Sequence, residues 1–495
     1  MRIRSVVTAS KKHAIQVVSK VRGCLKIHKH IGTYSGDEEK GRLLSLAQEY
    51  IRKEIDQCEL FTPDPTTWRL NEVEVVSSHS SYLYQLLSLA YDQLGFTGDP
   101  LIRDLVIARL YQPSSKRETR QILSEVFAKD YSLTTVYRHL KKAISKGLKT
   151  QYQTALVNFA KGELGDDLRL VFYDVTTLAF ATQTRTELKD FGYSKDHRSQ
   201  DAQVVVGLVV NRQGFPLYFD VFSGNTFEGG TFVQVVGNVK KLLACPDLVV
   251  VADAGMLSQK NMDELEREGI LFVVGARISS LSLPVIGEIV KQLGQLDGAT
   301  TEISHKQYRL LADYSAKRAK KDLYDLTKQW EKAQKALTKP DGVTRRYRFL
   351  RGSKRASFVL NTKLKEKAEM IAGIKGYITN TKLDAMTIIT RYHDLWKVEK
   401  AFRMTKSDLR ARPIFLRLNE TIKAHLTIVF AGLAIAKLLE FQTDMSIHQI
   451  IQTTSRIFTH TIRNTTTGET TTIQTKIPDT DLCGKLDRIY HLGTK

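Results

Sequence analysis

The sequence has 495 residues, too many for one hydrophobic core, and this length suggests roughly two to four domains. Its 42% apolar content excludes a chain that is disordered throughout. A formal charge of +21 and an isoelectric point near 9.6 place it among proteins that bind polyanions, either nucleic acid or an anionic membrane surface.

Secretion and a membrane span are not expected. The N-terminus has basic residues but no continuous apolar stretch, so it is not typical of a cleaved secretory signal. The longest apolar run, from Leu426 to Ala436, is shorter than the roughly 20 residues that cross a bilayer and indicates a core helix. The four cysteines lie far apart without a CxxC pair, so neither a zinc site nor a disulfide framework is indicated. We expect a cytoplasmic protein.

Basic residues gather in two segments of the chain. The first 36 residues contain no acidic side chain, and residues 301–360 contain 16 Lys and Arg against 6 Asp and Glu. One such run is often only a solvated surface. Two runs in a chain this basic favour contact with phosphate groups.

Residues 1–165 are predicted to be mainly helical after a short β-like start, and to bind DNA. Ser132 suits the N-cap of a helix that continues to Lys146, and a helix over 117–127 precedes it. The short connection is typical of a helix-turn-helix over 117–146, although many helical hairpins with no role in DNA binding also have a basic face. We predict DNA contacts from the outer face of the second helix, by Arg138, Lys141 and Lys142.

Residues 166–277 change in character to β-branched and aromatic runs of strand length. Three such runs come first, followed by a helical stretch, a strand, a second helical stretch and a further strand. This order predicts a mixed sheet flanked by helices, an α/β fold. The predicted strands cover 168–173, 202–210, 216–222, 248–252 and 271–277, and the predicted helices cover 230–243 and 259–268.

An insertion, two helices and a tail are predicted for the remainder. Residues 278–384 are polar, basic and partly helical, and are longer than a connection within a compact domain needs, so we expect an inserted subdomain. Its Trp330 either stacks on an extruded DNA base or packs against its own subdomain. The segments predicted after the insertion are the helices 385–409 and 420–439 and the C-terminal tail 446–495.

Three acidic side chains occur where such a sheet would hold a catalytic site. Asp174 and Asp253 each follow a predicted strand, so both should emerge at carboxyl ends of strands, and Glu399 lies on the 385–409 helix. Converging carboxylates can hold two Mg²⁺ or Mn²⁺ ions, one activating the attacking oxygen and the other stabilising the leaving oxygen. A single Asp after a strand is more often a turn former, so only the combination predicts phosphoryl transfer on a nucleic acid backbone.

Tyr392, Glu399 and Lys406 are spaced by seven residues in the predicted helix. Each step of seven turns the helix through about 700°, only about 20° short of two full turns, so the three side chains should share one face. A buried face would be apolar, whereas this one offers a phenol, a carboxylate and an ammonium group. Such a face suits a site that handles a metal and a phosphate.

Several ordered motifs resemble transposases of the IS-four group, DDE enzymes of bacterial insertion sequences, and especially the long branch of that group with a GYSKDHR motif. The likeness extends from the N-terminal SVVTAS…KHIG segment to about Leu439. The matching segments are YDVTT at 173–177, GYSKDHR at 192–198, VVVGLVV at 204–210, VADAGMLS at 251–258 and YHDLWKVEKAFRMTKSDLRARPI at 392–414.

The resemblance implies an RNase H-like catalytic core, here 166–277 and 385–445, with the large insertion 278–384. The implied reaction is cleavage of double-stranded DNA at the terminal inverted repeats, followed by attack of the freed 3′-hydroxyl on target DNA. The implied assembly is a homodimer on DNA. The implied catalytic residues and metal ligands are Asp174, Asp253 and Glu399, with two Mg²⁺ or Mn²⁺ ions.

The resemblance also suggests DNA contacts around this triad. Tyr392, Glu399 and Lys406 match three positions of the group's Tyr-Arg-Glu-Lys signature, and the Arg position falls on Leu395. Arg403, one turn beyond Glu399, either compensates or is an ordinary surface residue. The GYSKDHR motif contributes further contacts near the first aspartate, or is only a structural loop; its candidates are Lys195, His197 and Arg198.

Two other functions are open at this point. An RNase H-like nuclease would cut DNA without joining it, and an inert descendant of a transposase would only bind DNA. The intact acidic set argues against the inert protein. No basic amphipathic helix with a large aromatic face stands out, which argues against a membrane role.

Overall fold

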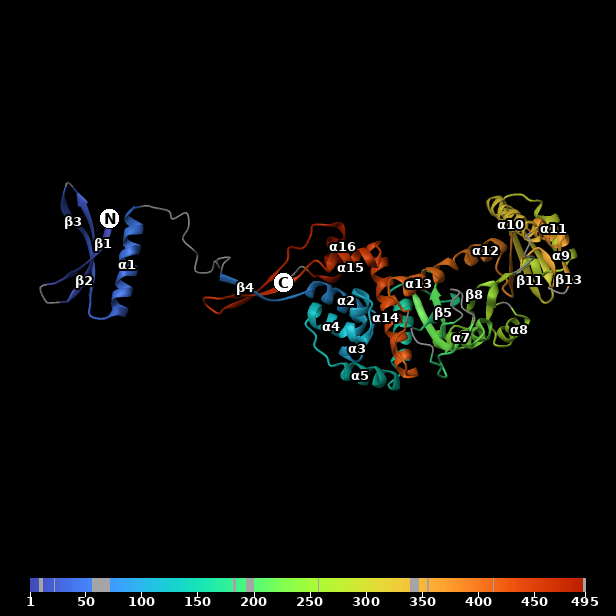
Figure 1. Cartoon of the computed structure of the whole chain (residues 1–495), viewed down its shortest axis with the longest axis horizontal. Coiled ribbons are helices and arrows are strands. Elements are labelled where there is room, and N and C mark those ends of the chain that lie inside the picture. The colour runs from blue at the N-terminus through green and yellow to red at the C-terminus, as the bar shows by residue number, and fades with distance from the viewer. Residues whose placement is uncertain are drawn as a thin grey trace. The chain divides into compact units, whose positions relative to one another are not determined.

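The computed structural model shows a chain that forms two compact units (Figure 1). The first unit contains Met1–Glu74 and Arg463–Thr470, and the second contains Val75–Ile462 and Thr471–Lys495. The predicted N-terminal region, 1–165, therefore has residues in both units. The structure describes residues 1–8, 12–21, 23–55, 72–180, 184–192, 200–256, 258–338, 347–353, 356–412 and 414–492.

The first unit has a small antiparallel sheet with one helix. Its described elements are β1 (Arg2–Val7), β2 (His13–Val21), β3 (Cys24–Tyr34) and α1 (Asp37–Ile55). The strands pair in the order β1-β2-β3. Ala47 of α1 packs with Ile15 and Val17 of β2 in a small apolar core. The predicted β-like start is confirmed, and it continues as a complete sheet.

The second unit contains a mixed sheet, and five of its strands form the centre. They are β5 (Leu170–Ala179), β6 (Gln203–Asn211), β7 (Pro216–Ser223), β8 (Val249–Ala252) and β9 (Leu271–Ala276). In the order β7-β6-β5-β8-β9, strands β5, β8 and β9 are parallel and β6 is antiparallel to β5. Every residue of β6 is buried, as expected for a strand covered on both faces. This arrangement is that of an RNase H-like core, and the predicted α/β fold is confirmed.

Three strands of the predicted insertion extend this same sheet. They are β10 (Thr300–His305), β11 (Tyr308–Tyr314) and β14 (Ile374–Thr379). β14 pairs antiparallel with β9, and β11 and β10 follow outward from it. A Cβ atom at Gly376 would lie 2.3 Å from Ile278 Cδ1, so a larger residue there would displace the Ile278 side chain. The insertion is thus partly continuous with the core sheet.

The rest of the insertion has a small apolar core of its own. Its elements are α10 (Ala316–Leu337), β12 (Leu350–Ser353), β13 (Ala356–Leu360) and α11 (Thr362–Met370), whereas α9 (Leu283–Leu293) packs against β10 and β11 of the main sheet. The ring of Trp330 on α10 lies 5.7 Å from that of Phe349, and Lys365 Nζ lies 5.2 Å from the centre of the Trp330 ring. Of the two roles predicted for Trp330, packing within its own subdomain is the one that the structure shows.

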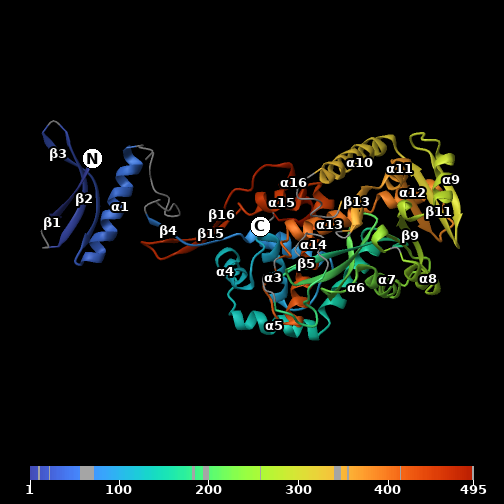
Figure 2. The same ribbon diagram turned by 45° about the vertical axis from the view of Figure 1, so that its right-hand side comes forward.

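The helices before the core sheet form one bundle with a long C-terminal helix. They are α2 (Ser81–Gln93), α3 (Pro100–Tyr111), α4 (Lys116–Phe127), α5 (Leu133–Ser145) and α6 (Leu148–Gly162), and the long helix is α14 (Asn419–Thr443). α14 lies between these helices and the sheet (Figures 1 and 2), and the ring of its Phe430 is 4.6 Å from that of Phe219 on β7. The predicted hairpin of α4 and α5 is confirmed, with Ser132 accepting a hydrogen bond from the N–H of Thr135.

α14 has 25 residues and is long and apolar enough to span a membrane by length and composition. It extends beyond the apolar run noted in the sequence. However, 94% of its most apolar window is buried inside the protein. The expected core helix is therefore what the structure shows, although the helix is longer than expected.

The remaining elements flank the sheet or follow α14. They are β4 (Val73–His79), α7 (Glu228–Leu243), α8 (Gln259–Arg267), α15 (Ile447–Thr454), β15 (Thr459–Asn464), β16 (Thr470–Gln474) and α16 (Asp481–Tyr490). The two helices predicted between strands of the core are confirmed as α7 and α8. The predicted tail is folded: β15 and β16 pair, and β4 adds a third strand beside β15.

Candidate active site

Asp174 lies in the middle of β5, not at its end as predicted. The strand continues to Ala179 because β6 pairs with it throughout, with Asp174 opposite Leu208. β8 pairs only with the segment from Leu170 to Tyr173, so the ladder between β5 and β8 stops immediately before Asp174. The prediction missed the continuation of β5 because that continuation depends on β6, which is distant in sequence.

Asp253 follows β8 directly, as predicted. Tyr173 pairs with Ala252 in parallel register, so Asp174 and Asp253 come one residue later on two neighbouring strands. Corresponding positions on parallel strands project to the same side of a sheet. Asp253 is exposed, and its Oδ1 accepts a 3.2 Å hydrogen bond from the hydroxyl of Tyr392.

Glu399 lies on the second of two helices, where the sequence predicted one. α12 (Ala385–His393) and α13 (Trp396–Ser407) are separated by a turn at 394–395. In this turn, backbone N–H groups donate to carbonyl groups three residues earlier, which is tighter than the α-helical pattern. The predicted continuous helix is therefore wrong, and the single face derived from its seven-residue spacing stays a prediction.

The two helices place Tyr392 and Glu399 differently. Tyr392, in the last turn of α12, is 4% exposed, whereas Glu399 lies exposed in the first turn of α13. α12 packs against β8 and β9, and α13 packs against β5 and β6. Both side chains are thereby carried to the strands that hold the two aspartates.

A glycine and strand β14 make the pocket for the Tyr392 ring. A Cβ atom at Gly275 of β9 would lie 2.3 Å from the hydroxyl oxygen of Tyr392. The ring of Tyr377 on β14 is 4.8 Å from that of Tyr392, and Lys375 Nζ lies 4.6 Å from the centre of the Tyr392 ring. Nothing in the sequence singled out these three neighbours, because their contact with Tyr392 depends on the pairing of β14 with β9.

The hydroxyl of Tyr392 lies within the electrostatic influence of all three predicted catalytic acids. Burial raises the pKa of Tyr392 above its usual value. The negative charges of Asp253, Glu399 and Asp174 raise this pKa further. Such influence weakens with distance, so the three carboxylates lie in the same region of the protein as this phenol. The phenol therefore stays protonated at neutral pH and donates a hydrogen bond to Asp253.

Lys375 brings positive charge to the same region. Burial and the neighbouring Arg318 lower the pKa of Lys375, whereas nearby carboxylates, including Asp253 and Glu399, oppose this shift. Arg318 is itself paired with Asp313, at 2.7 Å between Nη2 and Oδ2. An ammonium group at this place balances part of the charge of the candidate catalytic acids.

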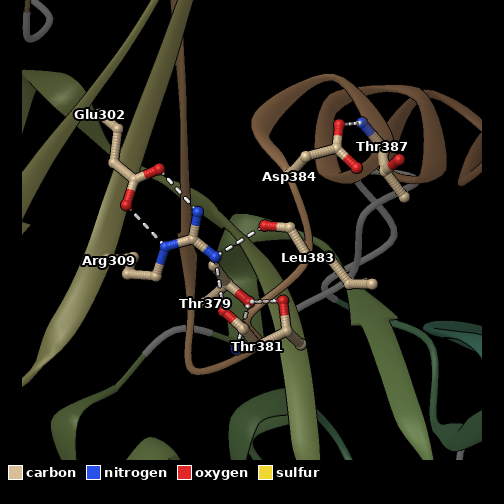
Figure 3. Close-up of polar contacts among 7 residues, drawn as sticks. All are labelled: Glu302, Arg309, Thr379, Thr381, Leu383, Asp384 and Thr387. Atoms are coloured by element: carbon tan, nitrogen blue, oxygen red, sulfur yellow. Dashed lines mark hydrogen bonds and ion pairs between the residues drawn. The ribbon is translucent and has the colours of Figure 1, made fainter.

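Arg309 of β11 fixes the start of α12 (Figure 3). Its Nη1 donates to the carbonyl oxygens of Thr381 at 2.6 Å and Leu383 at 2.7 Å. Its Nε and Nη2 each donate at 2.6 Å to one carboxylate oxygen of Glu302. Asp384, which follows Leu383 in the chain, is the N-cap of α12. The two contacts of Nη1 tie the added strands to the helix that carries the buried tyrosine, and the bidentate contact with Glu302 holds the guanidinium in place.

The donor chemistry of the acids suits divalent metal ions. Carboxylate oxygens are preferred ligands of Mg²⁺ and Mn²⁺, and the side chains of Asp253 and Glu399 are open to solvent. Within the described part of the chain, no three His, Cys, Asp or Glu side chains are close enough to form a ready-made metal site. The acids therefore form a shared neighbourhood and not a closed ligand set.

The other residues predicted near the triad have varied surroundings. Arg403 of α13 is exposed, and Lys406 is half-buried in the last turn. Leu395, at the signature's Arg position, is buried in the turn between α12 and α13. Tyr392, predicted to contact DNA, directs its hydroxyl to Asp253, and its contact with DNA stays a prediction. The predicted contacts that lie outside the described residues are Lys195, His197 and Arg198.

The basic face of α5 is exposed. Val136 and Leu140 of this helix are buried against the helical core. The opposite side carries the predicted DNA contacts Arg138, Lys141 and Lys142, all of them exposed.

Comparison with known families identifies the region that contains these acids. A model of the transposase DDE domain matches residues 165–435, more than half of the chain. The chain belongs to the DDE transposases. The match begins before β5 and ends within α14, so Asp174, Asp253 and Glu399 of this transposase all lie inside it.

Two further comparisons were made for this transposase. No curated protein matches it. Among solved structures, the cryo-EM structure of a piggyBac transposase synaptic complex with hairpin DNA is similar over 76% of this chain and 77% of that chain, at 10% sequence identity and a TM-score of 0.40.

Proposed function

We propose that this transposase cleaves double-stranded DNA at the terminal inverted repeats of a bacterial insertion sequence of the IS-four group and joins the freed 3′ ends to target DNA. One observation carries the proposal: Asp174 and Asp253 follow paired residues of two neighbouring parallel strands, and the buried Tyr392 donates a hydrogen bond to Asp253 at 3.2 Å. These two acids and Glu399 belong to the segment that matches the transposase DDE domain. This supports their assignment as the catalytic triad.

In this proposal Asp174, Asp253 and Glu399 hold two Mg²⁺ or Mn²⁺ ions. When bound, these ions supply charge neutralisation at the attacking and leaving oxygens of the phosphodiester. Tyr392 orients the Asp253 carboxylate through its hydroxyl, and Lys375 offsets negative charge beside it. The chain itself therefore contributes the ligands, their orientation and a nearby cation.

The proposed DNA contacts surround these acids and extend to α5. Lys406 and Arg403 of α13 hold phosphates of the transferred end, and the GYSKDHR segment acts beside them. The exposed cations of α5 bind the end of the element. The protein works as a homodimer on DNA and acts in the cytoplasm.

A strand-transfer assay tests the proposal. The substrates are duplexes with the inverted repeats that flank the gene, and joined products are sequenced after incubation with Mg²⁺, Mn²⁺, Ca²⁺ or excess chelator. We expect joining with Mg²⁺ or Mn²⁺, and binding without efficient chemistry with Ca²⁺, whose oxygen coordination is longer and looser. Cleavage without joining would identify a nuclease, binding without cleavage an inert DNA-binding protein, and full activity in chelator would contradict the two-metal proposal.

A further inference from the structure

Three basic side chains are buried together where α4 begins. Lys116, the first residue of α4, Arg109 of α3 and His425 of α14 are each 5% exposed. The guanidinium of Arg109 donates to the carbonyl oxygen of Leu409 at 3.4 Å and contacts Nδ1 of His425 at 3.3 Å. Among the described residues, no carboxylate contributes to the electrostatic environment of Lys116 or Arg109.

This arrangement is unfavourable in the absence of an anion. Burial penalises the charged form of Lys116, the charge of Arg109 repels it, and the N-terminus of α4 is the positive end of the helix dipole. Burial and Arg109 together hold the pKa of Lys116 well below its usual range, and burial lowers the pKa of Arg109 to about 10. Each of these effects would be reversed by a negatively charged ligand.

These buried cations line an open pocket of about 630 Å³. The lining also includes Arg117, Arg410 and Arg412, whereas the acid in it, Glu118, is exposed. A pocket of this volume has room for a phosphate together with the groups attached to it. Helix N-termini offer backbone N–H groups to such an anion. Charge, volume and helix orientation therefore all favour a phosphate.

The pocket adjoins both proposed DNA surfaces of this unit. α5 contributes Tyr137 to the lining and carries its exposed cations on the same helix. On another wall, the chain that contains Arg410 and Arg412 continues to Ile414, whose N–H donates to the carbonyl oxygen of Ala179 on β5 at 3.1 Å. The pocket is thus built on the helix proposed to bind DNA and on a segment attached to the strand of the first catalytic aspartate.

We propose that this pocket binds a phosphate group of the DNA backbone, with Lys116 at its base and Arg109 and Arg117 beside it. The identity of the ligand as DNA rests on the proposed function, but the phosphate chemistry does not. A free phosphate would satisfy the same cations, and the experiment separates the two sources.

The experiment compares two buried lysines in the full-length chain. In Lys116→Met the unpaired cation is lost and the apolar stem is retained. The matched control is Lys437→Met on α14, because Lys437 is 4% exposed but is paired with Glu440 at 3.0 Å. Thermal melting is measured with sodium phosphate and with sodium chloride at equal ionic strength. Binding to a mixed-sequence DNA duplex is measured over a range of salt concentrations.

We expect Lys116→Met to melt at a higher temperature than the wild type in chloride, because an unpaired buried charge is removed. It should lose the increase in melting temperature that phosphate gives the wild type. The slope of the logarithm of its DNA-binding constant against the logarithm of salt concentration should become shallower by about one unit. Lys437→Met should melt lower, because Glu440 loses its partner, and should keep both the phosphate protection and the wild-type slope.

The outcomes separate the anion site from the proposed function. Lost phosphate protection with an unchanged DNA slope would overturn the DNA backbone as ligand and identify a site for free phosphate. If phosphate raises the melting temperature of the wild type but the wild type does not bind DNA, the proposed function is contradicted and the anion site is supported. If Lys116→Met keeps both the phosphate protection and the wild-type slope, the proposed anion site is overturned. If Lys116→Met does not fold, Arg117→Ala, a change at an exposed side chain, should lower the same slope and decides the question.

Discussion

At the scale of single residues, the candidate active site gathers acids in one region of the protein. Asp253, Glu399 and Asp174 all act on one phenol, and Lys375 is the cation found beside them. Asp313, another acid of the region, forms an ion pair with Arg318. The clustering of the other three acids leads to the first prediction.

Asp174→Asn, Asp253→Asn and Glu399→Gln should each abolish cleavage and leave DNA binding nearly unchanged. Each change removes a charge with little change of shape, and should raise the melting temperature in chelator because like charges repel. Cleavage yield and thermal melting are the measurements. The control Asp313→Asn should lower the melting temperature, because it weakens a 2.7 Å pair with Arg318. Normal cleavage by Glu399→Gln would show that the triad is misassigned.

Tyr392→Phe should reduce cleavage by about tenfold and increase the Mg²⁺ concentration needed for half-maximal activity. A hydrogen bond to a charged group contributes about 1.5 kcal/mol, close to the roughly 1.4 kcal/mol of a tenfold change in rate. The matched control is Tyr377→Phe, which removes a 2.5 Å bond to Asp313 instead. It should affect stability but not the Mg²⁺ requirement. Equal Mg²⁺ curves for both variants would exclude a positioning role for the Tyr392 hydroxyl.

At the scale of elements, the sequence allowed local features to be predicted and concealed those that depend on distant partners. The cap at Ser132 is a contact within one helix turn, so its sequence signal was sufficient. The turn at 394–395 contains neither Gly nor Pro, and no local signal interrupts the helical pattern there. The pairing of β14 with β9 joins segments about a hundred residues apart, so the role of Lys375 could not be foreseen.

Arg309→Lys should loosen the start of α12 and lower the melting temperature. A single ammonium group cannot reproduce the four hydrogen bonds to Thr381, Leu383 and Glu302. A loss of about 2 kcal/mol would lower the melting temperature by roughly 2 °C in a unit of this size. Cleavage should fall as well, because α12 carries Tyr392.

The pH dependence of this effect gives its control. Hydrogen bonding to Arg309 lowers the pKa of Glu302 in the folded protein. The stability from the ionised pair is therefore present above the ordinary glutamate pKa and is lost as the pH falls through the lowered value. The difference in melting temperature between wild type and Arg309→Lys should narrow in acid. A difference that is constant with pH would mean that only the carbonyl contacts matter.

Combined replacement of Arg138, Lys141 and Lys142 by Ala should weaken DNA binding without lowering the melting temperature, because all three side chains are exposed. The slope of binding against salt should fall by up to about three units, near one for each lost phosphate contact. The control replaces three exposed lysines of α10, namely Lys317, Lys320 and Lys321. If the salt slope of DNA binding falls in the α10 control and not in the α5 variant, the DNA-binding surface lies on the insertion and not on α5.

At the scale of the whole molecule, segments far apart in the sequence complete one another. Helices α2, α3, α5 and α6 all pack against α14, which also packs against β7 of the core sheet. A chain ending at residue 418 should therefore expose apolar helix faces, bind a hydrophobic dye and aggregate. A chain ending at residue 445 retains α14 and should show a smaller dye signal. Equal signals from the two truncations would contradict this role of α14.

The position of α14 also affects how the protein is made. Translation from Gly162, at the end of α6, to Asn419 takes on the order of 10 to 50 s at ordinary elongation rates. During that interval the early helices have left the ribosome without the segment that covers them, and their apolar faces are available to chaperones. The proposed DNA surface on α5 is completed only when most of the protein has been synthesised. Chains released early by the ribosome would therefore be unable to occupy the ends of the element in place of the finished transposase.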